Sequence, residues 1–293
     1  MNNFEDPNYK FKKNTVENKI QLVEINGKKL PLPSEIEISE SGTCNRKCSF
    51  CPRSAPDFVD KKEFISDSLI DKLCSSLKKF DYHGTVRFSG FVEPLIDKNI
   101  YNLINKVRQS LNLVNIELVT NGDPLNEKRL NKLFENGLNR ILISVYDTEE
   151  DYNRFVQMCI KNNLNHEQFI VRKRYLSEDE NFGIVLSNRS GMLENAEFKI
   201  EKLNEPLNLH CYIPSYTFFL DYQGDVLICP HDWGKKIILG NLKFENFEDI
   251  WFGKKATNIR KMLNKKNRNF SPCNVCDVKG TLMGQKNAEL FNK

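Results

Sequence analysis

Apolar and polar positions follow two different periods along the middle of the chain. Short apolar runs, typical of buried strands, alternate with stretches whose apolar residues recur every three or four positions, typical of amphipathic helices. The strands that this pattern predicts are 35–39, 85–89, 116–120, 141–145, 168–172 and 184–187. Repeated β–α alternation with right-handed crossovers predicts an α/β fold with a parallel sheet or barrel.

Helix boundary signals support this assignment. One predicted helix begins at a Ser66/Asp67 cap, a second follows Asp97, and a third stops at Gly137. Six strands are too few to close an eight-stranded barrel. In such folds the active site lies at the carboxyl ends of the strands, so we look for chemistry there.

The two ends of the chain have a different character. Residues 1–33 are polar without a clear period, apart from a turn signal at Asn26-Gly27. Residues 208–285 predict two strands joined by a glycine-containing turn, followed by a helix. We therefore predict an N-terminal extension (1–33), the α/β domain (34–207), a small C-terminal α+β domain (208–285) and a tail (286–293).

Composition and charge narrow the class of protein. Hydrophobic residues make up 40% and charged residues 28%, and the formal net charge is +4. This balance does not favour nucleic acid or an anionic membrane as partner. No apolar run reaches the roughly 20 residues that cross a bilayer, and the amino terminus lacks the features of a secretory signal. We expect a cytoplasmic protein.

Nine cysteines are many for a reducing compartment, where disulfides are rare. Cys74 and Cys159 lie among helix-spaced apolar residues, so we interpret both as core, with a hydrogen-atom donor as the alternative for Cys159. Cys44, Cys48 and Cys51 form C-x3-C-x2-C. Three thiolates on one loop can hold three irons of a cubane and leave the fourth iron open. A zinc site is the alternative, although a fourth ligand is missing nearby.

A second set contains four cysteines, which would saturate all the irons of another cluster. A structural zinc site with four cysteine ligands is the alternative. The members of the set are Cys211, Cys229, Cys273 and Cys276.

The C-x3-C-x-aromatic-C pattern, with Phe50 at the aromatic position, resembles the signature of radical S-adenosylmethionine (SAM) enzymes. The resemblance implies a partial (β/α)6 TIM-like barrel and a [4Fe-4S] cluster whose open iron binds SAM. Reductive cleavage of SAM would give a 5′-deoxyadenosyl radical that abstracts a substrate hydrogen. A flavodoxin- or ferredoxin-type reductant would supply the electron.

The second cysteine set, with its hairpin and helix, resembles the twitch or SPASM-type domain of the same enzymes. That domain carries an auxiliary [4Fe-4S] cluster, and four cysteines fit the shorter, one-cluster twitch form. The spacing is similar to that of a dehydrogenase of this family that oxidises an amino-cyclitol.

The resemblance also implies SAM-binding residues at other strand ends. Glu93 would bind the SAM amino group, although its Ser-Gly-Phe-Val-Glu-Pro context departs from the family's Gly-Gly-Glu-Pro. Asn121 would lie near the adenosyl group, and Ser144 would contact the ribose or carboxylate. Arg172 and Arg174 face the same side of a strand, so one could bind the SAM carboxylate and the other the substrate. The alternatives are that Glu93 is an exposed loop residue and that Arg172 and Arg174 belong to a solvated run of charges.

We therefore expect an oxidoreductase that oxidises a carbinol of a sugar- or cyclitol-like small molecule, with the auxiliary cluster as electron acceptor. Asp232 or Arg174 would take the hydroxyl proton, unless Asp232 caps a turn. Ser187-Asn188-Arg189, which closes the sixth predicted strand, is a further candidate. A basic last segment of 40 residues, with ten Lys or Arg, would attract an anionic substrate or merely be solvated.

Three other hypotheses stay open. An epimerase would return a hydrogen atom from a thiol, for which Cys159 is the candidate. A peptide-maturing radical SAM enzyme would need a precursor peptide. A zinc-binding interaction module is the alternative that is not an enzyme.

Overall fold

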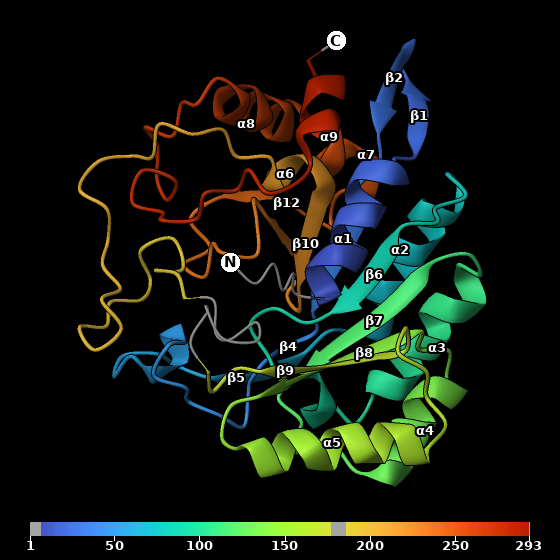
Figure 1. The fold of residues 1–293 in the computed structure, drawn as a ribbon. Helices are drawn as coiled ribbons and strands as arrows, with labels where there is room; N and C mark the ends of the chain where they lie inside the picture. Colours follow the sequence, from blue (N-terminus) through green and yellow to red (C-terminus); the bar gives the residue numbers. More distant parts are fainter. Residues whose placement is uncertain (1–6, 177–185, 293) are drawn as a thin grey trace.

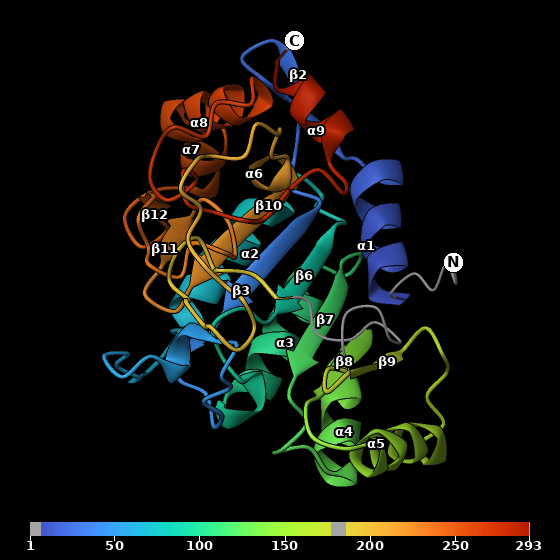
Figure 2. The ribbon, with the colours of Figure 1, turned by 60° about the vertical axis from the view of Figure 1, so that its left-hand side comes forward.

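The computed structural model describes residues 7–176 and 186–292. Its centre is an eight-stranded sheet of order β12-β11-β10-β3-β6-β7-β8-β9 (Figures 1 and 2). The strands from β10 to β9 in this order run parallel, and β11 and β12 add an antiparallel edge. Their bounds are β3 (Glu35–Ser39), β6 (Thr85–Phe88), β7 (Asn115–Thr120), β8 (Arg140–Val145), β9 (Phe169–Lys173), β10 (Thr217–Asp221), β11 (Asp225–Leu227) and β12 (Ile238–Asn241).

Helices α2 to α5 pack against one face of the sheet (Figures 1 and 2). Their bounds are α2 (Asp67–Lys78), α3 (Ile100–Ser110), α4 (Glu127–Glu135) and α5 (Glu149–Lys161). The Ser66 hydroxyl accepts a hydrogen bond from the Leu69 amide, and Gly137 follows α4 with φ 104°, which confirms both predicted boundaries. The predicted α/β fold is therefore confirmed, with an open sheet among the described residues.

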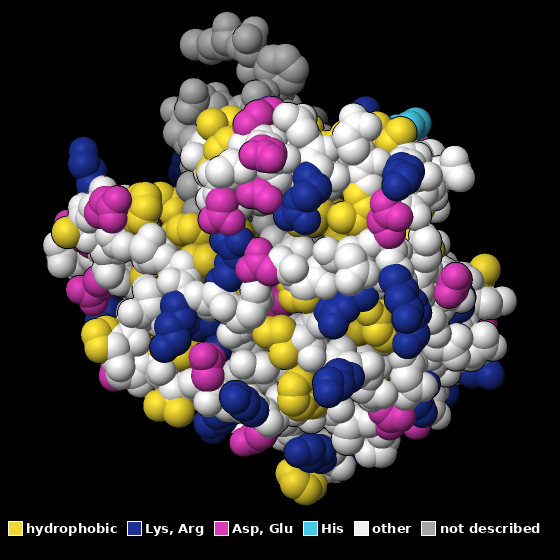
Figure 3. Space-filling view, turned by 90° about the horizontal axis from the view of Figure 1, so that it is seen from below, with side chains coloured by type: hydrophobic (Ala, Val, Ile, Leu, Met, Phe, Trp, Pro, Cys, Tyr) yellow, Lys and Arg dark blue, Asp and Glu magenta, His cyan; other side chains and the backbone are white. Residues whose placement is uncertain are grey.

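The remaining elements are short or lie near the ends of the chain. They are α1 (Pro7–Asn18), β1 (Leu22–Ile25), β2 (Lys28–Pro31), β4 (Ser41–Gly42), η1 (Pro52–Ser54), β5 (Lys61–Phe64), η2 (Pro94–Ile96), α6 (Ile213–Tyr216), α7 (Phe247–Trp251), α8 (Lys254–Asn264) and α9 (Gln285–Leu290). No described helix combines the length and the hydropathy needed to cross a membrane. Acidic and basic side chains are interspersed on the face seen from below, rather than gathered by sign (Figure 3).

The main hydrophobic core lies between the sheet and α2 to α5. Cys74 on α2 and Cys159 on α5 belong to it and are 2% and 0% exposed. Both are core residues, as the sequence pattern predicts. Cys159 does not line the cavity described below, so the structure argues against its role as a hydrogen-atom donor.

The sixth strand, predicted at residues 184–187, does not appear in the part of the chain that the structure describes. Ile184 and Val185 lie outside the described residues, and Leu186 and Ser187 form no strand. Instead, β10 from the C-terminal part lies parallel to β3, with Phe218 opposite Ile36. The predicted hairpin after residue 217 is confirmed, but it extends the main sheet instead of forming a separate one.

Helix α1 is a feature that the sequence pattern missed, because it presents no clear apolar stripe. It lies against the face of the sheet opposite α2 to α5 (Figure 2). Lys12 Nζ contacts Glu35 Oε1 at 2.9 Å, and the Arg140 guanidinium lies 3.7 Å from the centre of the Phe11 ring. The β1–β2 hairpin that follows confirms the predicted turn, with positive φ at Asn26-Gly27.

Buried ion pairs fill the face of the sheet that α1 covers. Arg87 binds Glu35 and Glu117, each at 2.7 Å, and Arg140 also binds Glu117 at 2.7 Å. All four side chains are buried. Strands β3, β6, β7 and β8 therefore have an apolar face toward the helices and a charged face toward α1.

Candidate active site

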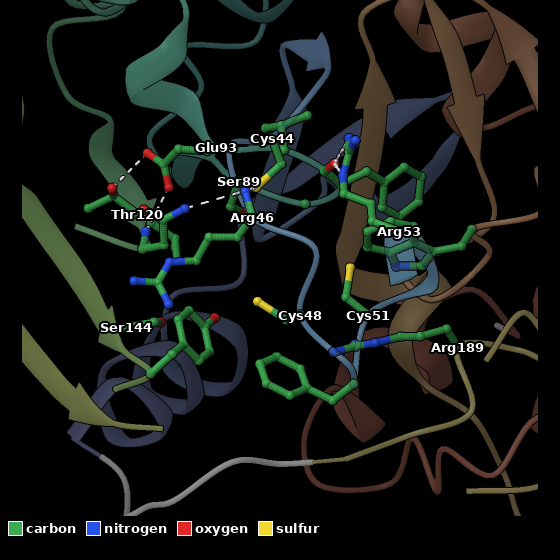
Figure 4. A pocket seen from close by; sticks show the side chains of 18 residues that line it. Cys44, Arg46, Cys48, Cys51, Arg53, Ser89, Glu93, Thr120, Ser144 and Arg189 are labelled. Carbon is green, nitrogen blue, oxygen red and sulfur yellow. Dashed lines mark hydrogen bonds between the residues drawn. The ribbon is translucent and has the colours of Figure 1, made fainter. Parts of the chain in front are cut away.

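A cavity opens where β3, β6, β7 and β8 end, as the fold predicts (Figure 4). Its empty volume, including the part open to solvent, is ≈ 700 Å³. The sulfur atoms of Cys44, Cys48 and Cys51 are on its wall, on the loop after β4. The other predicted site residues on its wall are Phe50, Glu93, Asn121 and Ser144.

Two arginines that the sequence did not single out fix the cysteine loop. Arg46 binds Asp123 and Asp147, at 2.5 and 2.6 Å, and these hydrogen bonds raise its pKa. Both acids come shortly after strands, β7 and β8, a position where the fold places site residues. Arg53 donates to the Phe91 carbonyl at 2.5 Å and pairs with Asp60.

Glu93 is 1% exposed at the end of the cavity wall. Its carboxylate accepts hydrogen bonds from Thr120 Oγ1 at 2.7 Å, from the Asn121 amide at 2.7 Å and from the Leu95 amide at 3.0 Å. Burial is the main cause that raises its pKa to about 7. A carboxylate has about four acceptor positions, so one is left for a donor in the cavity.

The other predicted SAM contacts have polar partners. Asn121 Nδ2 donates to Asn45 Oδ1 at 2.8 Å and lies 3.9 Å from Cys44 Sγ. The Arg172 guanidinium donates to Ser144 Oγ at 2.7 Å, behind the cavity wall. These contacts hold the Asn121 side-chain amide just after β7 and the Ser144 hydroxyl near the end of β8, and the two strands are neighbours in the sheet.

The two arginines of the fifth strand are less central than predicted. Lys173 pairs with Glu149 of α5, so Arg172 faces the other side of the sheet, as the alternation predicts. Arg174 follows the end of β9, and its amide donates to the Val145 carbonyl at 2.7 Å. Neither Arg172 nor Arg174 is among the described residues that line the cavity.

Asp232 has the turn-capping geometry that the sequence left as its alternative. It is 0% exposed, and its carboxylate accepts the amides of Lys236 at 2.9 Å and Ile237 at 2.8 Å. Both oxygens accept turn amides and Asp232 does not line the cavity, so the geometry favours the turn-capping role, and its role as a base stays a prediction. Its neighbour Trp233 lines the cavity instead and packs against Phe91, with ring centres 4.3 Å apart.

Arg189 reaches the cavity through an unusual backbone segment. Arg189, Ser190 and Gly191 have φ of 48°, 55° and 82° in succession. Left-handed backbone at residues other than glycine is costly and is often retained at functional sites. Arg189 lines the first cavity, whereas Ser190 lines a second one. This segment therefore separates the two cavities.

The second cavity is lined by all four cysteines of the second set, together with His231 and Arg268. No three His, Cys, Asp or Glu among the described residues lie close enough to hold one metal ion. A tetrahedral zinc site, with Zn–S of about 2.3 Å, needs such closeness. A Cβ at Gly280 would come 2.4 Å from Cys211 Sγ, so the site also requires a glycine there. All four cysteines line one cavity with an empty volume of ≈ 370 Å³, so soft thiolate donors for an iron-sulfur cluster converge there.

Comparisons with known proteins agree with this geometry. The sequence profile of the radical SAM superfamily matches residues 38–186, and that of an iron-sulfur cluster-binding domain (SPASM) matches residues 211–277. The chain is 30% identical over 245 residues to the S-adenosyl-L-methionine-dependent 2-deoxy-scyllo-inosamine dehydrogenase of Niallia circulans, covering 83% of this chain and 92% of that protein. It is also 31% identical over 129 residues to a GTP 3′,8-cyclase of Aquifex aeolicus (strain VF5), covering 43% of this chain and 39% of that protein.

Solved structures show the same fold. The crystal structure of BtrN in complex with AdoMet and 2-DOIA superimposes with a TM-score of 0.71 and 28% identity, covering 86% of this chain and 97% of that chain. A structure of anSMEcpe with bound AdoMet has a TM-score of 0.53 at 13% identity, covering 89% of this chain and 95% of that chain, and so shows the fold alone.

These matches decide between the hypotheses on cofactors. They imply a SAM-binding [4Fe-4S] cluster, SAM itself and an auxiliary iron-sulfur cluster, and they exclude the zinc-binding interaction module. The predicted domain boundaries at 33/34, 207/208 and 285/286 stay predictions. The chain is an enzyme that belongs to the radical SAM superfamily.

Proposed function

We propose that this enzyme oxidises a secondary hydroxyl of a cyclitol- or sugar-like small molecule to a ketone. The observation that carries the proposal is the match along 92% of the length of a dehydrogenase that acts on 2-deoxy-scyllo-inosamine. A second cavity with four cysteines supports it, because a cluster with no open iron can only conduct electrons.

The first cavity supplies the residues for SAM. Cys44, Cys48 and Cys51 would hold three irons of the first cluster, and Phe50 would pack beside it. Glu93 would accept a hydrogen bond from the SAM amino group through its remaining lone pair, and a charged donor makes this bond strong. When bound, the cluster and SAM supply the reducing electron and the 5′-deoxyadenosyl group that removes one hydrogen atom from the substrate.

The other SAM contacts support each other across two strands. Ser144 Oγ accepts from Arg172 and also hydrogen-bonds the Tyr146 side chain, so a SAM oxygen would bind beside these two hydroxyl groups. Asn121 is fixed by Asn45 at the mouth of the cavity near Cys44. Arg172 therefore acts through Ser144 rather than on SAM directly.

Substrate would lie between the two cavities, beside Arg189 and Trp233. The Arg189 guanidinium would donate to the substrate oxygen and stabilise the negative charge that develops as the hydroxyl proton leaves to water. Arginine keeps its own proton, so neither Arg189 nor Arg174 is a good base. After one hydrogen atom is removed, the substrate radical would still have to lose one proton and one electron to become a ketone, and the cysteines of the second site would hold the group that accepts this electron.

Electron supply and location follow from the same chemistry. A flavodoxin- or ferredoxin-type protein is the proposed donor to the first cluster. We propose a cytoplasmic location, because cysteine ligands must stay reduced before the clusters assemble and the cytoplasm is reducing.

The test uses anaerobically reconstituted enzyme with SAM, dithionite and a panel of cyclitols that includes 2-deoxy-scyllo-inosamine. We expect a ketone and 5′-deoxyadenosine in a one-to-one ratio. An epimer that contains solvent deuterium, without net oxidation, would contradict the proposal. The buried position of Cys159 does not favour that outcome.

A further inference from the structure

Arg268 is buried inside the C-terminal domain at the wall of the second cavity. Its side chain is among the largest fully buried ones and is 2% exposed. It donates to the carbonyls of Leu209 at 3.0 Å, His210 at 2.8 Å and Val278 at 2.8 Å, and also to that of Lys279. A buried arginine with this many backbone partners is held in one place.

The partners of Arg268 belong to the two segments that carry cysteines of the second set. Leu209 and His210 directly precede Cys211, whereas Val278 and Lys279 follow Cys276 by two and three residues. The guanidinium therefore joins the two cysteine-carrying segments, which are also joined by a hydrogen bond from the Tyr212 amide to the Gly280 carbonyl at 2.8 Å. Its place next to the four sulfur atoms is fixed by these bonds.

The positive charge of Arg268 is not neutralised by a carboxylate. All four of its acceptors are neutral carbonyls, and no ion pair of Arg268 occurs within residues 7–176 and 186–292. Among the described residues that line the second cavity, it is also the one with a permanent positive charge. The charge is therefore free to act on whatever the cavity holds.

A cubane with four thiolate ligands is an anion, and reduction adds one negative charge. Burial disfavours that added charge and lowers the reduction potential, whereas a nearby cation raises it. The rest of the wall is largely apolar, with Ile213, Ile228 and Leu263. Without Arg268, burial alone would make the second cluster a poor electron acceptor.

We propose that Arg268 is a positioning residue that raises the reduction potential of the auxiliary cluster and so enables it to accept the electron left by substrate oxidation. This inference rests on the proposed function for its purpose. The effect of the Arg268 charge on the reduction potential of the cluster does not depend on which substrate the enzyme takes. One electron is transferred in this step. The substrate radical is oxidised to the ketone, its hydroxyl proton goes to water, and the cluster is reduced by one electron.

The test measures the midpoint potential of the auxiliary cluster in the full chain by a redox titration followed by EPR. Changing Cys44, Cys48 and Cys51 to alanine leaves the second cluster alone to observe. In that background, Arg268→Gln removes the charge, and Arg268→Lys keeps it while losing the planar fork. Arg260→Gln is the matched control, because Arg260 is also buried and bonded to backbone carbonyls, but outside the cavity.

We expect Arg268→Gln to lower the ratio of reduced to oxidised cluster at a fixed potential at least tenfold, which is 59 mV for one electron. Arg268→Lys should stay within threefold of the parent, and Arg260→Gln within twofold. A cluster that binds to the lysine variant but not to the glutamine variant also supports a role of the charge. Equal shifts, or equal loss of iron, in both Arg268 variants would overturn the proposal, as would no shift in either.

These results are distinguishable from a failure of the proposed function. The potential is measured without SAM or substrate, so an enzyme with another substrate would still show the shift. Conversely, the Arg268→Gln enzyme could make ketone at the full rate while the midpoint potential of its auxiliary cluster is unchanged. That result would support the proposed function and contradict the proposed role of Arg268.

Discussion

The burial of Glu93 brings the change of charge of its carboxylate close to neutral pH. Burial raises its pKa to about 7, above the usual value near 4.5, so it becomes negative as the pH rises through neutrality. The negative form binds an ammonium group better. We therefore expect the affinity for SAM to fall about tenfold from pH 8 to pH 6, by proton linkage with this pKa. Equilibrium titration of reconstituted enzyme with SAM, without reductant, measures it.

Glu93→Gln provides the control for this pH dependence. The amide still fits the cavity wall and stays neutral at every pH, so binding should be weak and nearly independent of pH. A slope that persists in the glutamine variant would assign the titration to another group.

Arg189 is expected to act on the substrate and not on SAM. Replacing it by alanine removes a charge-assisted hydrogen bond, worth about 1.5–3 kcal/mol, so kcat/KM for ketone formation should fall roughly 10- to 100-fold. The Kd for SAM should stay within about threefold. Parallel losses of SAM binding and turnover would show that Arg189 serves the cofactor instead.

At the scale of elements, the buried charges beneath α1 should dominate local stability. Arg87→Met leaves Glu35 and Glu117 buried without their shared cation, and breaking such a pair costs about 3–5 kcal/mol. Denaturant unfolding of the protein measures the loss. Lys161→Met is the control: it removes an exposed pair with Glu127 and should cost less than about 1 kcal/mol. Similar losses in both variants would contradict this account.

The same charges explain which elements the sequence could predict. The strand 35–39 and the helix after Ser66 follow from apolar periodicity and a cap, because their packing is against an apolar core. Helix α1 does not, because Lys12 and Phe11 meet charged partners on β3 and β8. A pattern of apolar positions carries no signal for a helix that docks on arginine and glutamate.

The pairing of strands that are far apart in the sequence was the second feature that the sequence could not predict. Residues 217–221 are recognisable as a strand, but their apolar character does not tell which neighbour they take, and they pair with β3. Within the site, cysteine spacing located both cavities, whereas the roles of Asp232 and Trp233 depend on a turn. Asp232 and Trp233 are adjacent in the sequence, yet Trp233 lines the cavity whereas Asp232 caps the turn.

At the scale of the whole molecule, the chemistry depends on two cavities separated by one short segment. Arg189 lines the first and Ser190 the second, so substrate bound at Arg189 would be within electron-transfer reach of the four cysteines. Changing Cys273 and Cys276 to serine should halve the iron content and leave SAM cleavage in place. Ketone formation should fall at least about 100-fold, equivalent to about 2.7 kcal/mol in the activation free energy, because the electron left on the substrate then lacks its acceptor.

Cys159→Ala is the matched cysteine control for this experiment. Cys159 lies in the core of α5, away from both cavities, so the variant should lose some stability but keep full iron content and ketone formation. Iron analysis, 5′-deoxyadenosine and ketone are measured on the same samples. If the Cys273/Cys276 variant still made ketone at the parent rate, the electron would leave the substrate by another path, and the second site would have a structural role only.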